Sequence, residues 1–135
     1  MARLIDTTVF IEVERRGHPP SAVQVLAAGE PIAMSSISAA ELLFGVERAD
    51  SLERRRQRVE FIEAVLAEVP VLPFDLHVAR VYGQVWGRLR ATGTQIARHD
   101  LMIAATAMAF GNEVLTYNIR HFERVPGLTV SRPEL

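Results

Sequence analysis

Short apolar stretches alternate along this chain with longer segments whose apolar residues recur at helical spacing. The strand-like stretches lie at residues 2–6, 32–37, 69–74 and 114–117, with a further candidate at 128–130. The remaining segments predict helices at residues 7–16, 20–28, 38–50, 52–68, 75–91 and 100–110. Strands that alternate with helices form a parallel sheet covered by helices, because parallel strands need crossover connections. We therefore expect an α/β fold, a three-layer α/β/α sandwich with a central, mainly parallel sheet.

The amino-acid composition excludes several classes of protein and several kinds of functional site. The chain has 135 residues, the size of one domain with a substantial core. It contains no cysteine, which excludes disulfides and thiolate metal sites, and its basic residues are all arginine, which excludes chemistry that needs a lysine amine. The net charge of −1 means that any surface for nucleic acid must be local. No signal peptide or apolar run of about 20 residues is visible, so we expect a soluble cytoplasmic protein.

Three carboxylates stand where a helical segment begins, namely Asp6, Glu41 and Asp100. Right-handed crossovers bring the strand-to-helix turns of a parallel sheet to one edge, where the ligands of such sheets bind. Acids gathered among apolar residues are costly unless a cation neutralises them. Mg²⁺ or Mn²⁺ would do so, because hard cations prefer oxygen ligands. Such an ion would polarise a phosphate and activate a water for in-line attack on a phosphodiester.

Each acid also has a purely structural interpretation. Asp6 and Asp100 could each cap the helix that begins at the next residue, and Ser38 with Glu41 has the spacing of a capping box. Two other acid-rich classes are disfavoured. A receiver domain needs a late lysine, and a haloacid-dehalogenase-like phosphatase needs a second aspartate where this chain has Thr8. No GxGxxG or Walker loop supports nucleotide binding.

Five short segments together resemble a PIN-domain ribonuclease, and specifically a VapC-type toxin of a type II toxin–antitoxin pair. They are LIDTTVFI at 4–11, SISAAELLFG at 36–45, DLMIAATA at 100–107, LTYN at 115–118 and FERVPGL at 122–128. Each segment is weak evidence alone, whereas their common order and spacing is specific. The resemblance spans essentially the whole chain and implies a single PIN-like domain over residues 1–135. It also implies a metal-dependent endoribonuclease that hydrolyses RNA phosphodiester bonds.

The resemblance assigns roles to four residues. It implies that Asp6, Glu41 and Asp100 are catalytic ligands of a Mg²⁺ ion, with Mn²⁺ as the alternative. Asn118 stands where many PIN domains carry a fourth acid, and an amide cannot supply that charge. We therefore expect one well-held metal ion, with Asn118 orienting water or substrate.

Further polar residues near the expected edge are candidates for supporting roles. Thr8 and Thr116 could orient an acid or a water through their hydroxyls, or could make only local hydrogen bonds. Arg98 and Arg120 are candidates for RNA binding, because a guanidinium group suits phosphate geometry. His99 adjoins the third acid, yet neighbouring residues of a helix point in different directions, so we do not expect it in catalysis. The other histidines, His18, His77 and His121, are expected at the surface.

The resemblance also implies partners. The RNA substrate is one, and a cognate VapB-like antitoxin is another, whose C-terminal segment packs into a hydrophobic groove and approaches the active site. Phe10, Ile11, Leu43 and Phe44 could line that groove or belong to the core. We expect a homodimer. Two alternatives remain: a catalytically idle PIN-like domain that binds RNA or protein, kept open by Asn118, and a PIN nuclease of RNA processing outside a toxin–antitoxin pair.

Overall fold

The structure of the protein, a computed structural model, describes residues 2–134. Five strands form one sheet in the order β3-β2-β1-β4-β5, and every neighbouring pair is parallel. The strands are β1 (Arg3–Ile5), β2 (Ile32–Ser35), β3 (Val71–Leu72), β4 (Glu113–Leu115) and β5 (Val130–Ser131). The predicted parallel sheet is thus confirmed, and β1 lies at its centre.

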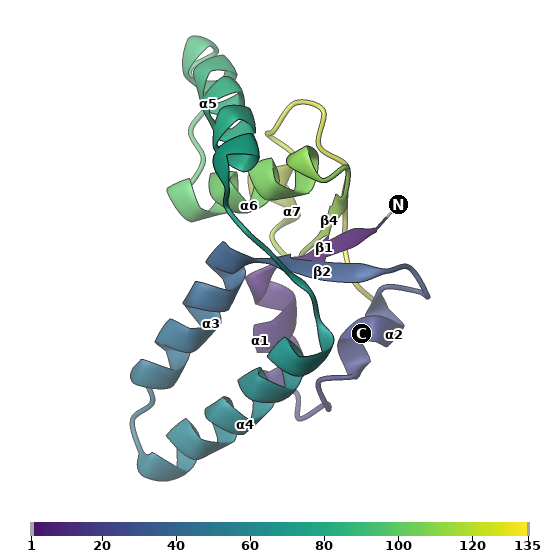
Figure 1. The fold of residues 1–135 in the computed structure, drawn as a ribbon, viewed down its shortest axis with the longest axis vertical. Coiled ribbons are helices and arrows are strands. Elements are labelled where there is room, and N and C mark those ends of the chain that lie inside the picture. Colours follow the sequence, from purple (N-terminus) through teal and green to yellow (C-terminus); the bar gives the residue numbers. More distant parts are fainter. Residues whose placement is uncertain (1, 135) are drawn as a thin grey trace.

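Helices cover both faces of this sheet (Figure 1). One face carries α1 (Thr7–Arg15), α2 (Ala22–Leu26), α3 (Ser36–Glu47) and α4 (Leu52–Glu68). The other face carries α5 (Leu76–Ala91), α6 (Arg98–Ala109) and α7 (Ile119–Phe122). The expected three-layer α/β/α sandwich is therefore confirmed. Within residues 2–134, no helix is both long and apolar enough to cross a membrane.

The core consists of two clusters, one on each face of the sheet. Side chains of successive strand residues point to opposite faces. In β1, Leu4 accordingly packs with the cluster of α5, α6 and α7, and Ile5 packs with the cluster of α1 to α4. The next residue, Asp6, stands at the carboxyl end of this central strand. The strand that both clusters enclose thus ends directly before an acid, at the edge where ligands are expected.

Two helices begin earlier than predicted, which removes two of the structural interpretations of the acids. The N-cap of α3 is Ser35, whose Oγ accepts a hydrogen bond from the Ser38 N–H at 3.0 Å. A capping box of Ser38 with Glu41 is therefore wrong, and Glu41 lies in the second turn. The N-cap of α6 is Ala97, so that Asp100 lies inside the first turn and does not cap the helix.

Asp6 does occupy the N-cap position of α1, but its side chain makes no capping hydrogen bond. The carboxylate has other partners, described below. The short helix α7 was not predicted, because four residues are too few to show a helical period. This helix nevertheless carries residues of the candidate site.

Candidate active site at the carboxyl edge of the sheet

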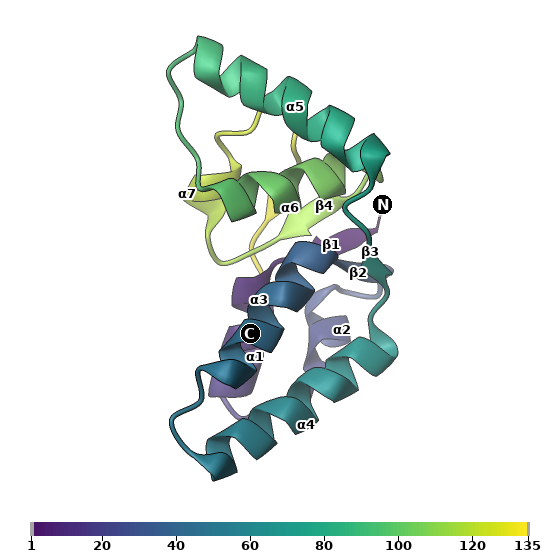
Figure 2. The same cartoon turned by 60° about the vertical axis from the view of Figure 1, so that its left-hand side comes forward.

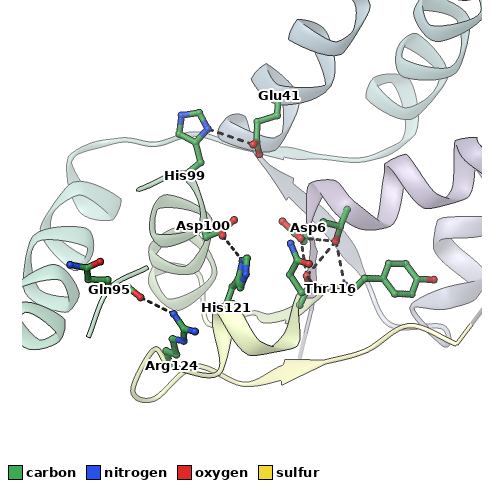
Figure 3. A network of polar contacts seen from close by, with 11 residues as sticks. Asp6, Glu41, Gln95, His99, Asp100, Thr116, His121 and Arg124 are labelled. Carbon is green, nitrogen blue, oxygen red and sulfur yellow. Dashed lines mark hydrogen bonds and ion pairs between the residues drawn. The ribbon is translucent and has the colours of Figure 1, made fainter. Parts of the chain in front are cut away.

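Asp6 is the most enclosed of the three acids, with a residue exposure of only 2%. Its Oδ2 atom accepts hydrogen bonds from the hydroxyls of Thr8, at 2.7 Å, and Thr116, at 2.8 Å. The Thr116 hydroxyl in turn accepts a hydrogen bond from the Asn118 N–H at 2.9 Å. Because β1 and β4 are neighbours, the residues that follow them meet at one edge (Figure 3).

The pKa of the Asp6 carboxyl group lies above its ordinary value. Burial away from water is the main cause, and the negative charge of Asp100 adds to it, whereas the hydroxyls of Thr8 and Thr116 act in the opposite direction. Among residues 2–134, no basic side chain pairs with Asp6. A cation beside Asp6 and Asp100 would remove this electrostatic penalty, so these two acids fit a divalent ion.

The other two acids each contact a histidine. Asp100 is partly buried, and its Oδ2 atom lies 3.1 Å from Nδ1 of His121. Glu41 lies 3.5 Å from Nδ1 of His99 through Oε2, and its Oε1 atom accepts a hydrogen bond from the Thr7 hydroxyl at 2.8 Å. Each contact joins segments that are far apart in the sequence.

The three acids do not form one ready-made cluster. In Figure 3 the carboxylates of Asp6 and Asp100 point toward one another, while Glu41 lies beside His99. In the part of the chain that the structure describes, no group of three or more histidine, aspartate or glutamate side chains could hold a metal ion as arranged. Asp6 and Asp100 therefore carry the fit to a cation, and Glu41 is occupied by other partners.

The remaining candidates of the sequence lie at the same edge. Asn118 is half-buried at the N-cap of α7, and its side-chain amide makes no hydrogen bond to another residue within 2–134. Arg98 and Arg120 are exposed, in the first turns of α6 and α7. Over the same described range, neither arginine has an ion pair or a side-chain hydrogen bond. Their charges are thus available to a ligand.

The two histidines are the residues that sequence reasoning missed. His121 is exposed, as expected, but its contact with Asp100 was not predicted. His99 was set aside because helical neighbours diverge, yet it reaches Glu41 of a different helix. The available signal was position: both histidines lie within a few residues of a predicted site residue.

A hollow of about 270 Å³ lies between α1, α3 and α4. Its apolar wall includes Ile11 and Leu42, and both Glu14 and Glu41 line it. Burial raises the pKa of Glu14, which the charge of Arg58 partly offsets. Of the four apolar residues considered for a groove, Ile11 is exposed and lines this hollow. Leu43 and Phe44 are exposed on α3 nearby.

For Phe10 the structure selects the core and not the groove. It is fully buried among the helices on its face of the sheet. Phe10 and Val13 lie three residues apart on the same side of α1 and are fully buried, whereas Ile11 between them is exposed.

Comparison with known proteins gives consistent results. Residues 3–128 match the PIN-domain family. Ribonuclease VapC1 of Rickettsia felis is 35% identical over 130 residues, covering 96% of this chain and 95% of that protein. The tRNA(fMet)-specific endonuclease VapC of Salmonella typhimurium is 35% identical over 97 residues, covering 72% of this chain and 71% of that protein.

Solved structures share the fold. The crystal structure of DNA-bound VapBC from Salmonella typhimurium matches with a TM-score of 0.84 and 28% identity, covering 98% of both chains. FitAcB from Neisseria gonorrhoeae matches with a TM-score of 0.83 and 29% identity, covering 96% of both chains. The family match, the identity to VapC relatives and the shared fold agree along nearly the whole sequence. This chain therefore belongs to the PIN-domain family and, within it, to the VapC ribonucleases.

Proposed function

We propose that this chain is a metal-dependent endoribonuclease, the toxin of a toxin–antitoxin pair, which hydrolyses RNA phosphodiester bonds in the cytoplasm. One observation carries the proposal: Asp6 and Asp100 approach one another at the carboxyl edge of the sheet, and no basic side chain among residues 2–134 balances the buried charge of Asp6. The VapC ribonucleases to which the chain is similar supply the substrate class.

In this proposal Asp6 and Asp100 hold Mg²⁺, with Mn²⁺ as the alternative ion. Glu41 is the third ligand, and it must exchange its contacts with Thr7 and His99 for the ion. When bound, such an ion supplies a Lewis acid and makes water a stronger nucleophile near neutral pH.

The other site residues orient the acids or bind the substrate. Thr8 and Thr116 both bind Oδ2 of Asp6, which fixes the rotation of that carboxylate. Asn118, whose amide has no partner within the described residues, orients water or a phosphate oxygen. Arg98 and Arg120 bind the RNA backbone, because exposed guanidinium groups without a counter-charge attract phosphate.

The test compares four purified proteins on total RNA: wild type, Asp6→Asn, Asp100→Asn and Asp50→Asn. Asp50 is the matched control, since it is exposed and pairs with Arg54 at the surface. New 5′ ends are sequenced after incubation with Mg²⁺, with Mn²⁺ or with a chelator. We expect discrete cuts by wild type and Asp50→Asn in the presence of a divalent ion, and rates at least about a hundredfold lower for the other two variants.

The other outcomes separate the parts of the proposal. Equal cutting by all four proteins would remove the two acids from the mechanism. Cutting in chelator would refute the dependence on metal. Folded wild-type protein that cuts no RNA would favour the catalytically idle domain.

We further propose that a VapB-like antitoxin packs an apolar segment into the hollow between α1, α3 and α4. Glu41 lines this hollow and is also a member of the site, so an occupant would reach the catalytic edge. Ile11→Glu should abolish neutralisation by an antitoxin encoded in a neighbouring reading frame, measured as growth rescue on co-expression. Val25→Glu is the control, because Val25 is exposed on α2 outside the hollow.

A homodimer is also part of the proposal. A monomeric mass by light scattering at micromolar concentration would contradict it. A missing antitoxin frame beside an active nuclease would instead favour a role in RNA processing.

A further inference from the structure

A cavity of about 550 Å³ lies between α5, the start of α6 and the segment that joins them. Figure 2 shows α5 extending across α6 at one end of the molecule. Tyr82, Trp86 and Leu89 of α5 form one wall, and Leu101 of α6 forms part of another. The volume lies within the range of about 300–1,000 Å³ that is typical of pockets for small molecules.

Trp86 forms an aromatic surface that is supported from behind. Its ring lies 5.5 Å from that of Tyr82, between centroids, and Tyr82 makes an edge contact with Phe74 at 5.7 Å. These contacts limit the motion of the Trp86 ring, yet Trp86 remains 47% exposed. A positioned and accessible indole is a suitable surface for stacking a planar ligand.

The cavity is also basic. Arg90 and Arg98 line it, and no acidic side chain is among its lining residues. Neither arginine has an ion pair or a side-chain hydrogen bond to any described residue. Two uncompensated guanidinium groups beside an aromatic ring suit a ligand that is planar and carries phosphates. A second copy of this chain docked through the same face would place the two arginines of each copy in one interface, with no acid among the lining residues to balance them.

The cavity lies next to a second hollow, which reaches His121 beside Asp100. Arg98 begins α6, two residues before Asp100. Gln95 and Ile96 line both this cavity and a smaller hollow of about 270 Å³ that His121 also lines. A ligand chain that leaves the cavity past this segment therefore reaches His121 and the acid that it contacts.

The segment between the two hollows is fixed. Arg124 donates a hydrogen bond from Nη1 to the Gln95 carbonyl at 3.0 Å, as Figure 3 shows. This contact ties the segment to the region that follows α7. This hydrogen bond thus holds a wall of the cavity close to the region that carries His121, the histidine beside Asp100.

We propose that this cavity binds one unpaired nucleobase of the RNA substrate, stacked on Trp86, with the adjacent phosphates bound by Arg90 and Arg98. The inference rests on the proposed function and adds a binding site for one base of the substrate, which must be unpaired at that position. A base inside a duplex is stacked between its neighbours and does not present its face to a side chain.

Trp86 gives a direct readout, because it is the only tryptophan in the chain. A single-stranded RNA oligonucleotide and a blunt-ended duplex of the same sequence are titrated into the Asp100→Asn variant, so that the RNA is not cut. Tryptophan fluorescence and the anisotropy of labelled RNA are recorded. We expect the single strand to quench Trp86 and the duplex to leave it unchanged.

Variants in the same background test the contacts. Trp86→Ala should weaken binding of the single strand between about fivefold and a hundredfold, and Trp86→Phe should retain most of the affinity. Arg90→Ala should weaken binding and reduce its dependence on salt. Arg88→Ala is the matched control: it removes the same charge from the same helix, and Arg88 does not line the cavity.

Three outcomes would overturn the inference. The first is binding of the single strand with no change in Trp86 fluorescence, and the second is unchanged affinity in Trp86→Ala. The third is a change from dimer to monomer in Trp86→Ala, which assigns the cavity to a second copy of the chain. Wild-type protein that neither binds nor cuts RNA would refute the proposed function together with this inference. Cutting by wild type without a fluorescence response refutes the inference alone.

Discussion

The environment of the Asp6 carboxylate lowers the stability of the folded protein, and the same environment favours the binding of a cation. Its carboxylate is buried beside another negative charge, and its pKa is raised mainly by the loss of hydration. A raised pKa means that the folded protein holds the ionised form less favourably than the unfolded chain does. Such a penalty is typical of functional sites, where ligand binding offsets it.

Asp6→Asn should therefore stabilise the protein in the absence of divalent ions, by about 1 kcal/mol at neutral pH. The amide oxygen can still accept the hydrogen bonds from Thr8 and Thr116. The pKa of Asp6 in the folded state lies above the ordinary value of 3.8. The loss of unfolding free energy that ionised Asp6 causes in wild type is therefore fully present at pH values above the folded-state pKa. It disappears when the pH falls below 3.8, because the carboxyl group is then protonated in both states.

Urea unfolding of wild type and Asp6→Asn across this pH range measures the effect. The difference in unfolding free energy should shrink as the pH falls, and added Mg²⁺ should stabilise wild type but not Asp6→Asn. Asp50→Asn, at the exposed surface, should behave like wild type across this pH range and should likewise be stabilised by Mg²⁺. A neutral-pH destabilisation by Asp6→Asn would contradict the argument.

At the scale of elements, the start of α3 connects a helix cap to the site. The Ser35 hydroxyl caps the helix through the Ser38 N–H and lies 3.3 Å from the Ser38 hydroxyl. The Thr7 hydroxyl lies within hydrogen-bonding distance of both Ser38 and Glu41. A local capping motif therefore supports the position of Glu41, an acid in the second turn of the helix.

Ser35→Ala should lower the unfolding free energy by about 0.5–2 kcal/mol, the usual effect of losing an N-cap, and should also slow RNA cleavage. Ser51→Ala is the matched control, since Ser51 caps α4 through the Arg54 N–H at an exposed position away from the site. We expect a similar loss of stability for Ser51→Ala with an unchanged cleavage rate. Denaturant unfolding and RNA cleavage assays on both variants test this prediction. Equal cleavage rates for the two variants would show that the cap of α3 does not affect the site.

The same element shows where sequence analysis reached its limit. The apolar pattern predicted a helix over 38–50, but the helix begins at Ser36, because Ser35 and not Ser38 is the residue whose backbone leaves the strand. Three serines among residues 35–38 offer alternative caps of nearly equal propensity. The pairing of β2 with β1 and β3 then decides which serine ends the strand.

For the molecule as a whole, the sheet separates two clusters of core residues, and α1 contributes to only one of them. Phe10 of α1 is fully buried in that cluster, whereas Phe44 of α3 is 60% exposed. Both phenylalanines lie in apolar stretches with helical spacing. Their different burial depends on how α1 and α3 pack against each other and against the sheet.

Phe10→Ala should cost about 3–5 kcal/mol of unfolding free energy, because a large buried side chain leaves a cavity. Phe44→Ala should change stability by less than about 0.5 kcal/mol, since the ring is largely exposed. Midpoints of denaturant unfolding for the two variants test this pair. A comparable loss in Phe44→Ala would show that the face of α3 is covered in solution by another surface.

The sequence by itself determined the alternation of strands and helices, the parallel sheet and the meeting of Asp6, Thr8, Thr116 and Asp100 at one edge. Local periodicity and the fixed handedness of crossovers are sufficient for this. Only the tertiary structure decided that Glu41 is held by Thr7, 34 residues away, and that His121 contacts Asp100, 21 residues away. The cavity beside Trp86 was likewise decided by packing. Such contacts depend on side-chain rotamers and on the packing of distant segments, which no local pattern in the sequence encodes.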